Sequence, residues 1–264
     1  MHPTLARYLD PETARAALLL AESGDPVPEE HRHMVAAAQA NPKERRLVTK
    51  AGRTLDTKAQ QAVLFLATFA ALHALQEEAG TRPTLERARA KLAELGASPE
   101  EIDAMLAQAV ADEAFGTDQD PGHFDTRWFE ETLGDLPKLA ALQEDEVLAL
   151  IRSFVKTAPQ GDAMLYENAA RQLLKAAWSD GASPITAENM EDALDALSEQ
   201  YDGEDFERAA LALAKFIETM QEQKLIGPMR AERLTAIARA AAAAGIEDED
   251  EADDEESDEE DEAP

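Results

Sequence analysis

The apolar residues of this chain recur mainly at the three- and four-residue spacing that places them on one face of an α-helix. Two segments show this stripe most clearly, one formed by Val147, Leu150, Ile151 and Phe154, the other by Phe206, Ala209, Leu213, Phe216, Ile217 and Met220. A helix with a single apolar stripe buries that face and leaves the opposite face in water. We therefore expect both helices to lie on the outside of a helical bundle, with one face in its core.

The segment from Ala62 to Leu75 has a different pattern, because it is apolar nearly all round the helix. Only Thr68 and His73 place polar side chains within its 14 residues. Such a helix belongs in the middle of a bundle, where neighbouring helices cover it on several sides. It is too short to span a bilayer, which takes about 20 apolar residues.

Helix ends are marked by capping residues, prolines and glycines. Ser98-Pro99-Glu100-Glu101 is a capping box with proline at the first helical position, and Asp56 and Thr186 are placed as N-caps. The helices predicted in this way cover about 11–24, 28–41, 56–80, 99–115, 186–200, 204–224 and 228–244. No segment alternates apolar and polar residues as a half-buried strand does. We predict an all-α fold, an irregular multi-helix bundle of about ten helices with a disordered acidic C-terminal tail.

The stretch Gly116-Thr-Asp-Gln-Asp-Pro-Gly122 is the best candidate for a boundary, because glycine and proline interrupt helices. We expect an N-terminal helical subdomain over 1–115, a connector over 116–125, a C-terminal helical subdomain over 126–246 and a tail over 247–264. A chain of 264 residues can hold one large helical domain or two small ones, and both possibilities stay open.

Composition excludes several classes of protein. Apolar residues make up 44% of the chain, which is enough to build a core. The absence of cysteine excludes a disulfide framework, a thiolate nucleophile and any cysteine-ligated zinc or iron–sulfur site. The apolar run near the N-terminus, Ala16 to Ala21, is too short for the core of a signal peptide. We expect a cytoplasmic protein that does not span a membrane.

Nearly half of the net negative charge is concentrated at the C-terminus. The net charge is −30, and 14 of the 16 residues from Glu247 to Glu262 are acidic, which leaves −16 (−30 plus 14) for the rest. The tail residues that we single out are Glu247, Asp248, Glu249, Asp250, Asp253, Asp254, Glu255 and Glu256. So many like charges are not expected to fold at neutral pH. The tail could bind a basic partner, cover a basic patch of its own chain, or only keep the protein soluble.

One basic segment, residues 41–58, stands out in this acidic chain. Its six cations are Lys43, Arg45, Arg46, Lys50, Arg53 and Lys58, and its two acids are Glu44 and Asp56, so that it carries +4 (6 minus 2). The segment could bind phosphate or the acidic tail, or it could be a solvated connector whose cations pair with acidic neighbouring helices. It has no aromatic residue to stack on bases, and the acidic body repels nucleic acid, so we do not expect direct nucleic-acid binding.

Four of the 13 aromatic residues fall within 15 positions, namely Phe115, Phe124, Trp128 and Phe129. Aromatic side chains often anchor interfaces, and a binding groove between the two halves would be lined in this way. The alternative is that the cluster packs two subdomains together. We name Phe124, Trp128 and Phe129 as candidate partner-binding residues.

No constellation of residues indicates catalysis, a cofactor or a metal ion. Glu30 and His33 have the E-x-x-H spacing of a di-iron ligand pair, but the second copy that such a site needs is missing. His73 and Glu77 are spaced as a base and its orienting carboxylate, but no nucleophile is fixed beside them. The acidic residues after Asp118 do not fit an EF-hand, and no glycine-rich phosphate loop occurs.

These observations favour a non-enzymatic interaction or regulatory protein whose acidic tail engages a basic protein partner or its own basic segment. A first alternative is a small helical enzyme or ligand-binding domain with a cleft near Phe124 and Trp128. A second alternative is that the tail is only solubilising, or reflects adaptation to high salt. The partner, the biological process and the oligomeric state are not fixed by the sequence.

Overall fold

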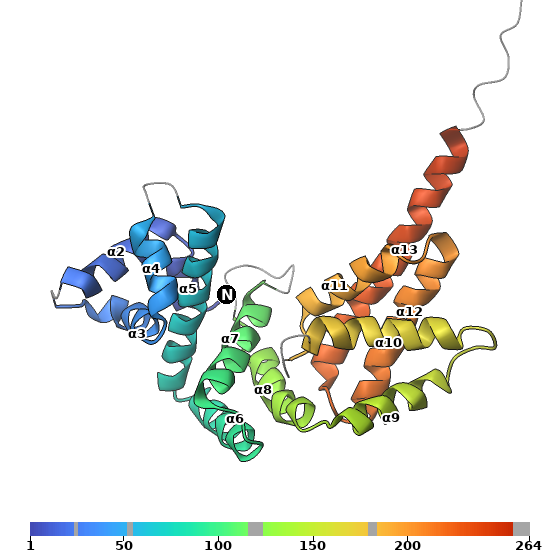
Figure 1. Ribbon diagram of the computed structural model, residues 1–264, viewed down its shortest axis with the longest axis horizontal. Coiled ribbons are helices and arrows are strands. Elements are labelled where there is room, and N and C mark those ends of the chain that lie inside the picture. The colour runs from blue at the N-terminus through green and yellow to red at the C-terminus, as the bar shows by residue number, and fades with distance from the viewer. Residues whose placement is uncertain (24–25, 52–54, 116–123, 179–183, 256–264) are drawn as a thin grey trace, which may run out of the picture. The chain divides into compact units, whose positions relative to one another are not determined.

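The fold is all-α in a computed structural model, which describes residues 1–23, 26–51, 55–115, 124–178 and 184–255, without the side chains of residues 21 and 245–255 (Figure 1). These residues form thirteen α-helices and one 3-10 helix, and no strand is found among them. The predicted fold class is confirmed, and the helices are slightly more numerous than we expected. None of the helices in the described ranges is long and apolar enough to cross a membrane.

Contacts between residues divide the chain into two units, Met1–Pro137 and Lys138–Pro264. The first unit holds α1 (Pro3–Tyr8), α2 (Pro11–Ser23), the 3-10 helix η1 (Glu29–His31), α3 (Arg32–Ala40), α4 (Pro42–Lys50), α5 (Thr57–Glu77), α6 (Arg82–Glu94) and α7 (Pro99–Phe115). The second unit holds α9 (Glu144–Val155), α10 (Ala163–Trp178), α11 (Ala187–Ser198), α12 (Gly203–Glu222) and α13 (Pro228–Glu255). The division falls within α8 (Thr126–Ala140), on the C-terminal side of the expected connector. Residues 116–123 of that connector lie outside the described residues, and its role as a boundary stays a prediction.

Helix α5 is the central helix of the first unit. It begins at its predicted N-cap, where the Asp56 carboxylate accepts a hydrogen bond of 2.8 Å from the backbone N–H of Ala59. It then contacts α1, α2, α3, α4, α6 and α7, which confirms the expectation from its apolar composition. Two residues depart from that pattern, because Leu64 and Phe65 are each 39% exposed.

The predicted capping box at the start of α7 is formed. The backbone N–H of Ser98 donates to Oε2 of Glu101 at 2.7 Å, and the backbone N–H of Glu101 donates to Oγ of Ser98 at 3.3 Å. The same reciprocal pattern at the start of α11 joins Thr186 to Asn189. Each box satisfies backbone N–H groups that the first turn of a helix leaves without an intrahelical partner.

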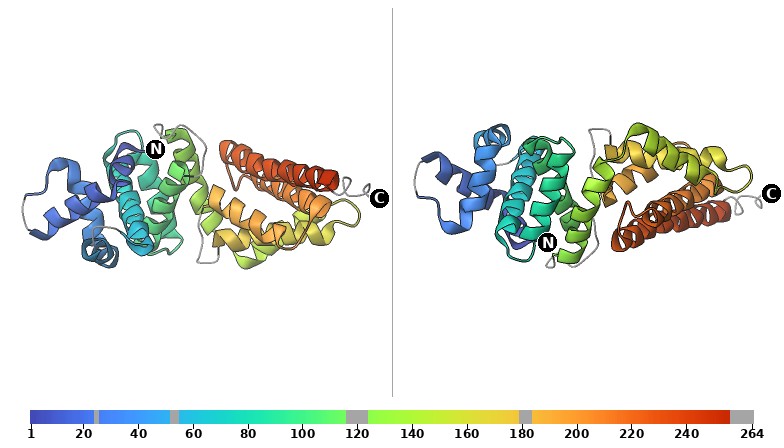
Figure 2. Two further views of the ribbon diagram at one scale, coloured as in Figure 1. Left: turned by 90° about the horizontal axis from the view of Figure 1, so that it is seen from above. Right: turned by 90° about the horizontal axis from the view of Figure 1, so that it is seen from below.

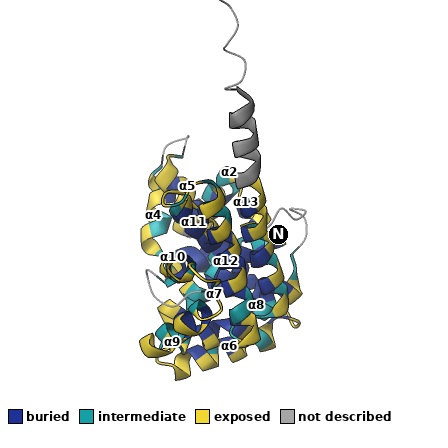
Figure 3. Cartoon of the chain, turned by 90° about the vertical axis from the view of Figure 1, so that its right-hand side faces the viewer, coloured by how far each residue is buried: buried dark blue, intermediate teal, exposed yellow. Residues whose placement is uncertain are grey.

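The core of the second unit is built from the two apolar stripes seen in the sequence. Phe154 of α9 lies between two rings, with centroid distances of 4.9 Å to Tyr166 and 5.0 Å to Phe216. Helix α12 is buried along its stripe and exposed on the opposite side (Figure 3). Phe206, at the start of that stripe, is only partly buried. Both stripes therefore lie where their spacing predicts, on helices with one face in a core.

Helix α13 extends beyond its predicted end. It lies beside α12 (Figure 2) and continues through Gly245 to Glu255, although we expected it to end at Ala244. Ala242 is the last of its described side chains that is buried. The predicted tail over 247–264 thus begins within the backbone of α13, and its residues 256–264 lie outside the described residues, so that its disorder stays a prediction.

Candidate functional site

The basic segment folds into α4, whose outer face carries most of its cations. Proline at the first helical position starts this helix, and Val48 is its only fully buried residue. Lys43, Arg46 and Lys50 are exposed, and Arg45 is half-buried. We call these four cations the α4 basic surface. Arg53, the fifth candidate residue of this segment, lies outside the described residues.

The cations of the α4 basic surface have few acidic partners. Lys43 approaches Glu44 at 4.0 Å, and the Lys43 side chain is 86% exposed. Among the described residues, no carboxylate forms an ion pair with Arg45, Arg46 or Lys50, and Nε of Arg45 is buried without a hydrogen-bond partner. The suggestion that acidic neighbouring helices pair with these cations is therefore not supported in the described part of the chain.

Three of the four aromatic residues are packed in the first unit, whereas Phe115 is 45% exposed. The rings of Phe124 and Phe129 lie 5.4 Å apart, and the ring of His2 meets that of Phe124 edge-on at 5.5 Å. Trp128 is 5% exposed and Phe129 is completely buried. This burial favours the packing interpretation over partner binding for Trp128 and Phe129. Nothing in the sequence pointed to His2, because the contact joins residues at opposite ends of the unit.

A carboxylate holds the start of α8 in place. The backbone N–H of Asp125 donates to Oε1 of Glu113 at 2.6 Å, and Glu113 itself is buried. The carboxylate of Asp125 in turn accepts from the backbone N–H groups of Arg127 at 2.9 Å and Trp128 at 3.1 Å. Asp125 therefore acts as a helix cap and not as part of a calcium loop.

The structure separates Glu30 from His33, the two residues with the spacing of a metal-ligand pair. The Glu30 carboxylate lies 3.9 Å from Arg7 and 3.9 Å from His31, whereas Nε2 of His33 lies 3.8 Å from Glu77 of α5. Within the described ranges, no group of three or more histidine, aspartate or glutamate residues could hold a metal ion.

His73 is half-buried on α5. Glu77, the carboxylate one turn later, interacts with other residues besides His73. Arg32 forms a salt bridge with Glu77, which draws that carboxylate toward α3. Burial lowers the pKa of His73, and the negative charge of Asp103 on α7 opposes this effect. Burial also lowers the pKa of His33, with Glu77 opposing. His73 is therefore a partly covered side chain with its polar neighbours spread over three helices.

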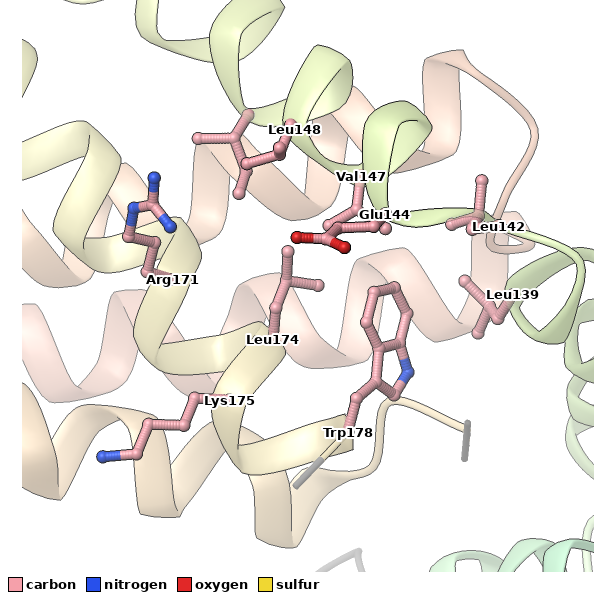
Figure 4. Close-up of a pocket in the computed structure, with 10 residues that line it drawn as sticks. Leu139, Leu142, Glu144, Val147, Leu148, Arg171, Leu174, Lys175 and Trp178 are labelled. Carbon is pink, nitrogen blue, oxygen red and sulfur yellow. The ribbon is translucent and has the colours of Figure 1, made fainter. Parts of the chain in front are cut away.

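An open groove lies within the second unit, between α9 and α10, with a volume of about 620 Å³ (Figure 4). Its apolar lining is formed by Leu139, Leu142, Val147, Leu148, Ile151, Leu174 and Trp178. Glu144 borders it from α9, and Arg171 and Lys175 border it from α10. This groove is not at the position that we expected from the aromatic residues of the sequence.

The groove could be anticipated only in part. The stripe on α9 supplies Val147 and Ile151, but Trp178 and Leu139 come from other helices and become neighbours only through the tertiary fold. The size of the groove is within the range of about 300–1,000 Å³ that is usual for small-molecule sites. No family model, curated protein or solved structure matches this chain.

Proposed function

We propose that this chain is a non-enzymatic interaction protein whose α4 basic surface binds a polyacidic segment, first of all the acidic tail of the same chain. The observation that carries the proposal is the lack of carboxylate partners for Arg45, Arg46 and Lys50 among the described residues. A chain with 55 acidic and 25 basic residues offers every cation many possible partners. Cations that have no carboxylate partner are therefore available to an anionic segment that does not belong to the described residues of the first unit.

Arginines elsewhere in the described chain provide the contrast. Arg32, Arg89, Arg171, Arg208 and Arg239 each form a salt bridge with a glutamate or an aspartate. These pairs lie on both units, whereas other described cations, such as Arg82, Arg87 and Lys175, form no ion pair with a described carboxylate. The α4 basic surface brings three cations without a described carboxylate partner, Arg45, Arg46 and Lys50, onto one helix. Charge complementarity favours the tail as the partner of this surface.

The expected binding is weak and depends on tethering. An exposed ion pair contributes at most about 1 kcal/mol, and salt screens it. A tethered segment, however, is present at an effective concentration on the order of millimolar. A tail that binds with a Kd of about 0.1 mM would therefore occupy the surface most of the time at low salt.

The test uses a peptide of residues 247–264 and a chain that ends at residue 246. The truncation leaves the described core intact, because Ala242 is the last described side chain of α13 that is buried. Titration followed by fluorescence anisotropy should give a Kd of about 0.1 mM in 10 mM salt, and no binding in 0.5 M salt.

Two triple variants with equal charge change locate the site. Lys43→Glu, Arg46→Glu and Lys50→Glu together should abolish binding of the peptide. Lys91→Glu, Lys156→Glu and Lys215→Glu together reverse three exposed lysines elsewhere in the chain and should retain most of the binding. Equal loss in both variants would mean that only the global charge matters. If the peptide binds neither the parent nor the control, the tail engages a separate basic protein or serves only solubility.

A further inference from the structure

The groove between α9 and α10 exposes apolar side chains that belong to the core of the second unit. Leu139, Ile151 and Leu174 form a buried floor, and Leu142 and Trp178 are only partly covered. Uncovered apolar surface that is continuous with a core costs stability in water unless something else covers it, and on soluble proteins it commonly marks a binding site. The groove therefore has the character of a site that is open in the free protein.

The charges around this apolar floor are asymmetric. Arg171 and Lys175 lie one turn apart on α10, on the same side of Leu174 (Figure 4). Arg171 is held by Glu167 at 2.7 Å, whereas no carboxylate of the described residues pairs with Lys175. Two cations at one edge, one of them without an acidic neighbour, favour an anionic group at that edge.

We propose that this groove binds an amphipathic carboxylate, that is, a hydrocarbon chain with one carboxylate at its end. The carboxylate lies between Lys175 and Arg171, and the chain runs over Leu174 toward Leu142 and Trp178. The cations give the direction of the ligand, and the apolar lining supplies most of its affinity, because each buried methylene group contributes about 0.8 kcal/mol.

Glu144 restricts which carboxylates fit. Figure 4 shows its side chain on the α9 side of the groove, across Leu174 from Lys175. A second carboxylate at the far end of the chain would come close to Glu144 and be repelled. The site therefore selects monocarboxylates over dicarboxylates of the same length.

The experiment is calorimetric titration of the full chain with decanoate, below its critical micelle concentration and in 0.15 M salt. Decanoate should bind one site and should bind about tenfold more tightly than octanoate, because it buries two more methylene groups. Decanol and decylammonium should each bind at least about tenfold more weakly than decanoate, because neither brings a negative charge to Lys175. Sebacate, the dicarboxylate of the same length, should bind more weakly as well.

Two pairs of variants place the ligand in the groove. Lys175→Glu should weaken decanoate binding about tenfold, whereas Lys215→Glu on α12 should leave it unchanged. Leu148→Glu should abolish binding, because it places a charge in the apolar lining of the groove. Leu211→Glu, which adds a charge at an exposed leucine outside the groove, should not. Helical content measured by circular dichroism checks that each variant folds.

Several results would overturn the proposal. These are the absence of saturable decanoate binding, equal affinity for decanol, or equal effects of Lys175→Glu and Lys215→Glu. A groove that is filled by a second copy of the chain would show a dimer that excludes decanoate and dissociates in Leu148→Glu. That result would also exclude the carboxylate as the natural occupant.

Discussion

At the scale of single residues, His73 shows how burial and charge oppose each other. Its ring is half-buried on α5, and desolvation lowers its pKa because it disfavours the charged imidazolium. Asp103 and Glu77 favour the charged form, Arg89 disfavours it, and the side chain of Gln76 offers it a hydrogen bond. The net lowering of the pKa means that burial outweighs the carboxylates.

This lowered pKa predicts a loss of stability in mild acid. The folded state holds the proton of His73 less tightly than the unfolded state, so the free energy of unfolding falls as the pH decreases from about 7 to about 5. His33 adds to this loss, because its pKa is also lowered. His73→Gln should reduce the slope of the free energy of unfolding against pH. The reduction should be less than about 1.4 kcal/mol per pH unit, which is the largest slope that one proton can give. Urea unfolding at several pH values measures it.

The control for this prediction is Leu64→Ala, on the same helix, which keeps every histidine and should keep the parent's pH dependence. A variant His73→Gln with an unchanged slope between pH 7 and pH 5 would contradict the assignment. Loss of stability at all pH values by the same amount would show only that the glutamine packs less well.

The capping residues show which residue-scale features the sequence predicts well. Asp56, Ser98 and Thr186 each accept a hydrogen bond from the backbone N–H three residues later, so the whole interaction lies within one helical turn. The partners of Glu77 could not be predicted in this way. Arg32 and His33 lie on another helix and reach Glu77 only after the helices pack.

At the scale of elements, α5 combines a buried and an exposed side within an almost wholly apolar sequence. Leu66 is completely buried, whereas Leu64, two residues earlier, is 39% exposed. Leu66→Ala should lower the free energy of unfolding by about 2–5 kcal/mol, because it leaves a cavity among the neighbouring helices. Leu64→Ala should lower it by less than about 1 kcal/mol. Trp128, buried in the same unit, reports the unfolding by its fluorescence.

Similar losses in the two variants would mean that Leu64 is covered in solution by something that binds the exposed side of α5. Similar small effects would mean that the neighbours of Leu66 collapse into the cavity. The comparison therefore tests the placement of α5 at the centre of the first unit, which the sequence pattern predicted.

Helices α1 and α8 show where prediction of elements fails. Helix α1 has only six residues, which is too short for an apolar stripe to be recognised. Helix α8 contains Gly134 and Pro137, two residue types that normally weaken or end a helix. Packing holds α8 together despite this local signal, since Phe129, Leu133 and Leu136 are buried.

At the scale of the whole molecule, the distribution of charge along the chain can be read from the sequence alone. Which of these charges pair with one another depends on the fold. The segment from 247 to 262 carries 14 of the 55 acidic residues, and this count needs no fold. The availability of the α4 basic surface, by contrast, depends on which carboxylates the fold brings near it. Only the arrangement of the helices shows that Arg46 and Lys50 have no such neighbour among the described residues.

These two features predict opposite effects of removing the tail. If residues 247–264 bind the α4 basic surface, their deletion removes an attraction, and the free energy of unfolding in 10 mM salt should fall by about 1 kcal/mol. If the tail only adds negative charge to an acidic body, its deletion relieves repulsion, and the same measurement should rise. Both effects should disappear in 0.5 M salt, where the Debye length is only about 4 Å.

The α4 triple variant, Lys43→Glu, Arg46→Glu and Lys50→Glu, decides between the two cases. On this background the attraction is absent, so deletion of the tail should raise the stability in 10 mM salt even if it lowers that of the parent chain. Deletion of the tail should therefore change the free energy of unfolding differently in the two backgrounds if the tail binds α4. It should change this free energy equally in both backgrounds if the tail only repels the body. An equal rise of the free energy of unfolding in both backgrounds would contradict the proposed function. It would mean that the α4 basic surface does not attract the tail.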